Sequence, residues 1–253
     1  MTGGAAPRAR LIRIVPGKPP ELVVYDRTSN CPYHPSRPAR LPLRLPARSL
    51  RARELDERLA EGDRRQGLVL YRTNCPLCDA CIPLRLDVER FRLHRTHRRI
   101  LRRGDQELTV SLGEPMLDAH RVQLYNKHKR ERGLAEEGPG IDADGYRSFL
   151  VETCCDTFEL RIFRGDELIG VSIVDRGFSS LSAVYTYYDP DHQSLSIGTY
   201  AILKQLELCR TWKMRYLYLG LYVVGARTMA YKAQFLPHQQ RRNGAWVDVE
   251  VPE

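Results

Sequence analysis

The sequence lacks several features that would place it in a membrane or secreted class. It has no run of 18 or more apolar residues, so we expect no transmembrane helix. Its first residues include no continuous apolar segment of signal-peptide length. With 42% hydrophobic and 28% charged residues, the composition is typical of a globular protein. We therefore expect a cytoplasmic protein with no membrane partner.

Two enzyme signatures are also missing. No arrangement of Ser, His and Asp resembles a hydrolase triad. No R/Q-x-x-G-x-G/A pyrophosphate loop precedes the long helix expected at residues 195–212, which argues against an acyl-CoA-dependent acetyltransferase. A non-catalytic, zinc-containing RNA-binding protein stays open as another alternative.

Lysine is scarce among the cations, and arginine dominates a formal net charge of +9 with a pI of about 9.3. This charge makes a polyanion such as RNA the natural partner. A generally arginine-rich, basic proteome would give the same charge, so charge alone leaves both interpretations open.

Seven cysteines are an odd number, which in a cytosolic chain favours thiols or metal ligands over a disulfide framework. Three of them, Cys75, Cys78 and Cys81, are spaced two residues apart in the segment Tyr71 to Arg90, and Cys31 precedes them. Four such cysteines fit a tetrahedral zinc site, an iron–sulfur cluster, or small buried thiols without metal. His34 could replace one of the cysteines as a ligand.

The first half of the chain mixes short strands and helices. Strands are expected at 21–26, 67–72 and 82–88, and helices at 49–60, with Ser49 as N-cap, and at 115–132. Between them lies a helix rich in arginine, in which the 3.6-residue period places four side chains on one face: Arg92, Arg95, Arg99 and Arg102. Together with Arg98, this face is either solvated or a phosphate-contacting stripe, and the high pI favours the stripe.

The second half has a different pattern. A hairpin at 159–164 and 168–175 is followed by a strand at 181–189, the long helix at 195–212, a strand from residue 214, a helix at 226–235 and a closing hairpin at Asn243-Gly244. The glycine-rich, acidic segment 133–145 suggests a domain boundary. We expect an α+β protein with an N-terminal cysteine-containing domain (1–135) and a C-terminal domain (136–253) whose element order is that of the acyl-CoA N-acetyltransferase fold.

Several separated motifs then resemble one family in the expected order. These are YRTNCPLCDACIPLRLDVERF, SAVYTYYDPDHQSLSIGTYAILKQLELCR, YLYLG and MAYKAQFLP, and they are similar to those of the bacterial aminoacyl-tRNA–protein transferases. After YLYLG the chain departs from the family's usual Tyr-Trp pair, since residues 221–224 read LYVV, and Cys154-Cys155 lies outside the family's cysteine pattern. We expect this pair to be structural thiols.

The resemblance implies transfer of an amino acid, leucine rather than arginine, from its tRNA to the N-terminal amine of proteins that begin with Asp or Glu, which marks them for N-degron degradation. It implies aminoacyl-tRNA and protein partners, no DNA, and no cofactor for transfer itself. Because eukaryotic relatives carry iron–sulfur clusters, it also raises the cluster interpretation of the four cysteines.

Site residues are expected where the strand at 181–189 ends and the long helix begins. The expected catalytic residues are Asp189, Asp191, Tyr187 and Lys232. The expected substrate-binding residues are Tyr185, Tyr188, Ser196, Gly198, Tyr231 and Arg85. The alternative for the aspartates is a turn with helix-capping potential, and the alternative for each tyrosine is a place in the aromatic core of the strand. The cation that reads an acidic N-terminus stays open among Arg85, Arg215, Arg227 and Lys232.

Overall fold

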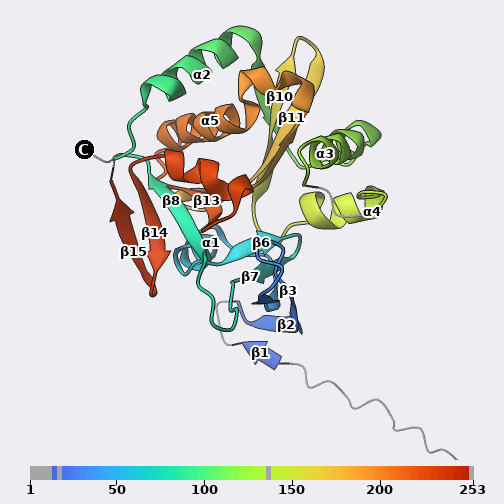
Figure 1. Cartoon of the computed structure of the whole chain (residues 1–253), viewed down its shortest axis with the longest axis vertical. Helices are drawn as coiled ribbons and strands as arrows, with labels where there is room; N and C mark the ends of the chain where they lie inside the picture. Colours follow the sequence, from blue (N-terminus) through green and yellow to red (C-terminus); the bar gives the residue numbers. More distant parts are fainter. Residues whose placement is uncertain (1–12, 16–18, 135–137, 251–253) are drawn as a thin grey trace, which may run out of the picture.

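The structure, a computed structural model, describes residues 13–15, 19–134 and 138–250 (Figure 1). It is an α+β fold built on one large mixed sheet, with a smaller sheet at one end. None of the helices in these residues has the length and apolarity needed to cross a membrane.

The large sheet has the strand order β15-β14-β8-β13-β12-β11-β10-β9. All neighbouring pairs are antiparallel except β12 and β13, which are parallel. The strands are β8 (Cys81–Asp87), β9 (Thr109–Gly113), β10 (Thr157–Arg164), β11 (Glu167–Arg176), β12 (Ser180–Tyr188), β13 (Tyr216–Val223), β14 (His238–Arg242) and β15 (Ala245–Val249).

The smaller sheet has the order β1-β2-β5-β7-β6, and β3 pairs with β4 separately. Its strands are short and come from the first 71 residues. They are β1 (Arg13–Val15), β2 (Glu21–Tyr25), β5 (Leu43–Pro46), β6 (Arg64–Gln66) and β7 (Val69–Tyr71). The separate pair is β3 (Thr28–Asn30) and β4 (Pro38–Arg40).

Helices cover both faces of the large sheet (Figure 1). Those described are α1 (Ala52–Ala60), α2 (Arg95–Glu107), α3 (Ala119–Glu131), α4 (Ala143–Tyr146), the π-helix η1 (Arg147–Val151), the 3-10 helix η2 (Pro190–Leu195), α5 (Ile197–Thr211) and the 3-10 helix η3 (Arg227–Gln234). On one face, α5 and α2 bury Leu206 and Leu101 against Leu84 and Leu160. On the other, α3, α4 and η1 form an aromatic layer with β11 and β12 around Tyr187.

Most expected elements are confirmed within a few residues, with three corrections. Helix α1 is capped by Arg51, not Ser49, because the Glu54 carboxylate accepts the Arg51 amide at 2.8 Å. Arg92 precedes α2, which begins only at Arg95, so it is not part of that helical face. The segment expected as a helix at 226–235 is the 3-10 helix η3.

Strands from both sides of residue 135 share the large sheet. Strand β8 lies between β13 and β14, and β9 forms the edge beside β10. The expected division at residue 135 therefore crosses one sheet, and the division itself stays a prediction.

Candidate functional site

Strands β12 and β13 begin side by side and then separate. Their ladder has only three pairs, from Ser180 with Tyr216 to Ser182 with Tyr218. Beyond these pairs, residues 183–188 of β12 and 219–223 of β13 are no longer partners. We call the space between these two stretches the wedge. Backbone groups that face a wedge need other partners, since they have left the ladder.

Two cations supply those partners, one on each side of the wedge. The Nη2 of Arg64, from β6, donates to the carbonyl oxygen of Ala183 at 3.1 Å. The Nζ of Lys232, from η3, donates to the carbonyl oxygen of Leu221 at 3.0 Å. Segments far apart in the sequence thus bring two cations to the same opening.

Gly220 lets these cations approach one another. Its φ is +85°, a backbone conformation that side chains disfavour. A Cβ at this position would lie 3.1 Å from the Arg64 Nη2 and 3.3 Å from the Lys232 Nζ. Because no side chain is present at Gly220, both nitrogens can lie close to the same point beside this glycine. The ladder between β13 and β8 also shifts register here, between Tyr218 and Gly220.

Neither cation forms an ion pair with a carboxylate of the described residues, although the charge of Asp175 acts on Arg64 through space. Arg64 is only 7% exposed, and in the described part of the chain no carboxylate forms an ion pair with Arg64 or Lys232. Burial lowers the pKa of Lys232 to about 7, and the charge of Arg64 adds to this effect. Its neighbour Arg65 differs, since its Nη2 contacts the Asp175 carboxylate at 2.8 Å with both side chains buried. Uncompensated buried charge is costly, so the wedge is suited to an anion.

The expected tyrosines have different surroundings. Tyr187 is fully buried, and its hydroxyl bonds to that of Tyr146, so the structure does not place it where a substrate could reach it. Burial raises the pKa of Tyr185 and Tyr188, and the Tyr188 hydroxyl accepts a hydrogen bond from Arg132. Tyr231 is 41% exposed, and Tyr188 and Tyr185 both interact with it electrostatically. Tyr231 is thus the one of the four open to solvent.

Asp189 and Asp191 follow the end of β12, and both pair with a single lysine. The Lys127 Nζ lies 2.7 Å from the Asp189 Oδ1 and 2.5 Å from the Asp191 Oδ2. Asp189 also accepts the Asp191 amide as the N-cap of η2. Burial alone would raise the pKa of Asp189. The hydrogen bonds from Lys127 and the Asp191 amide, together with the Lys127 charge, outweigh this effect, so the pKa is lowered. A carboxylate with a lowered pKa is a weak proton acceptor.

Ser196 and Gly198 lie where α5 begins, directly after η2. Ser196 is the N-cap with φ +54°, and its side chain makes no capping bond. A Cβ on Gly198 would lie 3.4 Å from the Tyr188 ring, so the first turn of α5 packs beside the end of β12. The first amides of a helix are donors without partners in the helix and attract negative charge.

Arginines cover the solvent side of α2. The side chains of Arg95, Arg98, Arg99 and Arg102 are exposed, and in the described residues none forms an ion pair. The start of α2 contacts the segment after η3, because the His94 Nε2 lies 2.9 Å from the Leu236 carbonyl oxygen and the His97 ring stacks on Phe235. The arginine face is thereby connected to the element that carries Lys232.

The four cysteines interact with one another. Burial raises the pKa of Cys81 to about 11, and so do the charges of Cys75, Cys31 and Cys78. The backbone amides of His34 and Arg40 donate to the sulfurs of Cys31 and Cys75, each at 3.4 Å. Among the described residues, no three His, Cys, Asp or Glu side chains are already arranged to hold a metal ion. The donor set itself fits zinc or a cluster chemically, because thiolate sulfurs are the usual ligands of both.

The cysteine segment is attached to the end of β13. Cys81 pairs with Val223 in the ladder between β8 and β13. The His34 Nε2 lies 3.1 Å from the Val224 carbonyl oxygen. This segment therefore supports the strand that forms one side of the wedge.

The other expected cations are engaged elsewhere. Arg85 lies between the rings of Tyr216 and Trp246 and donates to the Tyr218 hydroxyl at 3.0 Å. Arg215 pairs with Asp87 at 3.0 Å. The side chain of Arg227 lies outside what the structure describes.

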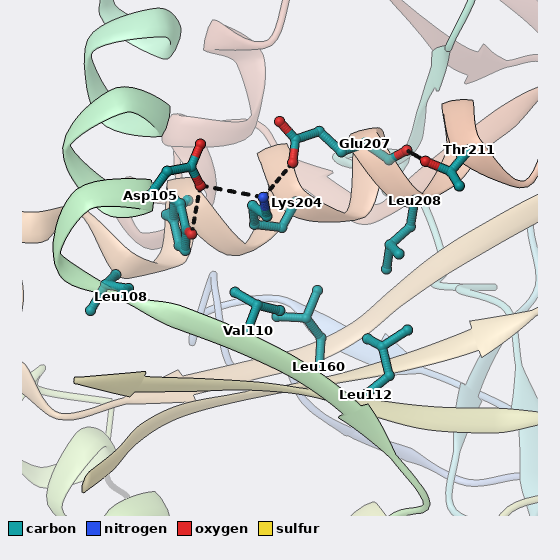
Figure 2. Close-up of a pocket in the computed structure, with 10 residues that line it drawn as sticks. Asp105, Leu108, Val110, Leu112, Leu160, Lys204, Glu207, Leu208 and Thr211 are labelled. Carbon is teal, nitrogen blue, oxygen red and sulfur yellow. Dashed lines mark hydrogen bonds and ion pairs between the residues drawn. The ribbon is translucent and has the colours of Figure 1, made fainter. Parts of the chain in front are cut away.

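A separate cavity of about 360 Å³ lies between α2, β9 and α5 (Figure 2). Its apolar floor includes Val110 and Leu112. Its charged residues are paired with one another, since the Lys204 Nζ contacts Asp105 at 3.3 Å and Glu207 at 2.5 Å. The wedge differs in holding charge without a partner.

Sequence reasoning missed Arg64 and Gly220. Arg64 stands in the unremarkable segment DRRQG, and nothing in its neighbours separates it from Arg65. Gly220 did give a signal, because a glycine inside the strand pattern YLYLGLYV indicates a bulge or a close backbone approach.

Two family models match the chain. The model described as arginine-tRNA-protein transferase, N terminus, matches residues 29–99, and the model described as arginine-tRNA-protein transferase, C terminus, matches residues 120–242. The matched ranges include both strands of the wedge, both of its cations and all four cysteines.

Relatives match over most of their length. The chain is 37% identical over 217 residues to the aspartate/glutamate leucyltransferase of Chromobacterium violaceum, covering 85% of this chain and 89% of the relative. It is 35% identical over 225 residues to that of Thiobacillus denitrificans, covering 88% and 92%. Among solved structures, L-PGS from Bacillus licheniformis matches with a TM-score of 0.47 and 12% identity over 65% of this chain and 61% of its own, which is too distant to support an inference.

Proposed function

Since this chain belongs to the arginine-tRNA-protein transferase family and is an aminoacyl-tRNA–protein transferase, we propose that it donates leucine to the N-terminal amine of proteins that begin with Asp or Glu. The name shared by its relatives, aspartate/glutamate leucyltransferase, supports both the donor and the acceptor. The product would be a substrate for N-degron degradation. The proposed location is the cytoplasm, where aminoacyl-tRNA is found.

The chemistry asks little of the protein's own functional groups. The ester of aminoacyl-tRNA is already activated, so the α-amine of the acceptor attacks the carbonyl carbon directly and tRNA leaves. An α-amine has a pKa of about 7.7–8, so a substantial fraction is neutral near neutral pH. The protein has to position two substrates and stabilise the developing oxyanion.

We place this reaction at the wedge. The observation that carries the proposal is its two adjacent cations, buried Arg64 and partly buried Lys232, neither of which forms an ion pair among the described residues. Lys232 would contact an anionic group of a substrate. Tyr231, which is exposed beside it, and Tyr185 and Tyr188 would line the approach. The first amides of α5, including that of Gly198, would face the ester or the last phosphate of the tRNA. The amide of Ser196 is not available for this contact, because it donates to the Gln193 carbonyl oxygen at 3.0 Å.

Asp189 and Asp191 would orient the acceptor amine by charge. Their pairing with Lys127 and the lowered pKa of Asp189 favour orientation over proton abstraction. The exposed α-amine can instead release its proton to water, since its own pKa is close to neutrality.

The exposed face of α2 would bind the tRNA backbone. Arg95, Arg98, Arg99 and Arg102 project charge to solvent without carboxylate partners, which favours phosphate contacts. The contacts between the start of α2 and the segment after η3 would place the end of the tRNA near the wedge.

The separation of two parallel strands supports an N-acetyltransferase-like arrangement for residues 136–253. We propose that the N-terminal residues 1–135 contribute the cysteine segment and the arginine helix. Cys31, Cys75, Cys78 and Cys81 would hold zinc or an iron–sulfur cluster, which would stiffen the segment attached to β13. Elemental analysis and a visible spectrum of anaerobically purified protein distinguish zinc, a cluster and neither.

Transfer of radiolabelled amino acid to a peptide that begins with Asp tests the proposed activity. Wild-type protein should transfer leucine from leucyl-tRNA more efficiently than arginine from arginyl-tRNA. If the protein prefers arginyl-tRNA, the donor is arginine and not leucine. If it transfers neither amino acid, the proposed function is refuted.

A further inference from the structure

We infer that Arg64, together with Lys232, binds the side-chain carboxylate of the acceptor's first residue. This inference rests on the proposed function, because it assigns the acceptor's acidic group to a place in the wedge. The juxtaposition that carries it is two cations on different elements lying close to the same point beside Gly220.

The fold holds Arg64 in place without neutralising it. The two adjacent arginines of β6 differ in their partners. Arg65 forms a buried ion pair with Asp175, whereas Arg64 donates a hydrogen bond to the Ala183 carbonyl oxygen and forms no ion pair among the described residues. Asp175 acts on Arg64 only through space. Its guanidinium keeps further N–H groups that can form a fork with a carboxylate. Arg64 is therefore fixed in position and can accept a carboxylate as its ion-pair partner.

The burial of Arg64 and the closeness of the two cations favour a carboxylate over an RNA phosphate. Arg64 is 7% exposed. Its Nη2 and the Lys232 Nζ lie 3.1 Å and 3.3 Å from the point where a Cβ on Gly220 would be, so one small anion beside Gly220 can contact both cations. A phosphate in a nucleotide chain is bulky and contacts proteins through exposed cations, which α2 supplies instead. A terminal carboxylate on a short side chain is small and planar, and matches a buried guanidinium.

The same geometry explains why an amide should be rejected. An Asn or Gln side chain has nearly the shape of Asp or Glu but cannot neutralise the two cations. Binding it would leave buried charge without a counter-ion, a penalty that discriminates strongly between near-isosteric groups. Arg64 is thus a specificity-determining residue for the acceptor.

Acceptor peptides that begin with Asp, Glu, Asn or Gln test this assignment, using the aminoacyl-tRNA that the wild-type chain accepts. Arg64→Gln should lower kcat/KM for the Asp and Glu peptides at least about 30-fold. It should leave the Asn and Gln peptides and the KM for aminoacyl-tRNA nearly unchanged. Loss of the same size for all four peptides, or a raised KM for aminoacyl-tRNA, would overturn the assignment and indicate a phosphate contact.

Arg85→Gln is the rival variant, since Arg85 is also buried and has no ion pair among the described residues. If Arg85→Gln removes the preference for acidic peptides while Arg64→Gln keeps it, the assignment is wrong. Should Arg64→Gln fail to fold, Arg64→Lys and Lys232→Met, which alter separate elements, replace it. If Arg64→Lys and Lys232→Met both keep the full wild-type preference for Asp peptides over Asn peptides, the inference is also refuted.

Calorimetry with the dipeptides Asp-Ala and Asn-Ala separates this inference from the proposed function. Wild-type protein should bind Asp-Ala at least about 30-fold more tightly than Asn-Ala, and Arg64→Lys should reduce that ratio. If wild-type protein transfers the amino acid but does not bind Asp-Ala more tightly than Asn-Ala, only the inference is refuted. If it prefers Asp-Ala but transfers nothing, only the proposed reaction is refuted.

Discussion

Lys232 is a residue whose charge is unfavourable in the folded protein. Its pKa falls from 10.5 to about 7 because it is buried and lies near Arg64. Between these two pH values the unfolded chain binds more protons than the folded one, so this residue makes stability rise with pH. The penalty is fully present below about pH 7. A site that keeps such a cost is expected where function requires a charge.

Replacing Lys232 with Met should reveal this cost. The variant's stability relative to wild type should be higher at pH 6.5 than at pH 9.5, by about 1–2 kcal/mol, while transfer activity falls. Denaturant unfolding at the two pH values measures the difference. Lys204→Met is the matched control, because Lys204 is paired with Asp105 and Glu207 and its removal should not give this relative gain at low pH.

His128 affects the stability of the protein at acidic pH. It is 4% exposed, and its Nδ1 lies 3.0 Å from the Tyr188 carbonyl oxygen. Burial lowers its pKa from 6.5 to about 4, and Arg132 and Lys129 add to this while the Tyr188 backbone opposes it. The unfolded chain therefore takes up a proton first as the pH falls, and stability is lost between pH 6.5 and about 4.

Substituting His128 with Asn should flatten the acid limb of the stability profile. The full wild-type loss from this residue is on the order of 3 kcal/mol. Thermal or urea unfolding from pH 7 to pH 4 measures it, and the exposed His120 is the control position. An unchanged slope in His128→Asn would show that other groups control acid unfolding.

At the scale of elements, α2 packs against the core with one face and presents arginines to solvent with the other. Leu101 and His97 are buried against the sheet and Phe235, while the arginines face solvent. The sequence period predicted this division well, because an amphipathic helix shows it in the pattern of apolar residues. The start of the helix was harder to predict, because Arg92 precedes α2 and Arg95 begins it, although both residues are arginines at helical spacing.

Replacing Arg95, Arg99 and Arg102 with Gln should weaken tRNA binding and lower its salt dependence. The slope of log K against log salt should fall by about 2–3 in magnitude if each arginine contacts one phosphate. Filter binding at several salt concentrations measures this. Arg48, Arg147 and Arg176, which are exposed and paired with carboxylates on other elements, give a control with the same change in net charge. An equal slope in both triple variants would mean that net charge alone drives binding.

At the scale of the whole molecule, the strands could be predicted individually but their neighbours could not. Alternating apolar residues indicated β8, β10, β11, β12 and β13, because that pattern is local. The insertion of β8 between β13 and β14 depends on contacts across more than half the chain. For the same reason the residues of the wedge were only partly predicted: Lys232 belongs to a recognisable motif, whereas Arg64 reaches the wedge only through the fold.

The insertion of β8 also makes a prediction about fragments. A polypeptide of residues 136–253 should not fold alone, because removing β8 leaves β13 and β14 without the strand between them and exposes Leu84 and Leu86's apolar partners. Circular dichroism and heteronuclear NMR of the fragment check this, with the full chain as control. A fragment with dispersed NMR signals would support an independent domain beginning near residue 136.

The position of β8 has a kinetic consequence as well. Arg85 and its hydrogen-bond partner Gln239 are 154 residues apart in sequence, so the central strands of the sheet cannot assemble until the ribosome has made almost the whole chain. Proteins dominated by such distant pairings fold slowly, and their apolar strands stay exposed in the meantime. The nascent enzyme should therefore remain protease-sensitive and dependent on chaperones until its last hairpin leaves the exit tunnel.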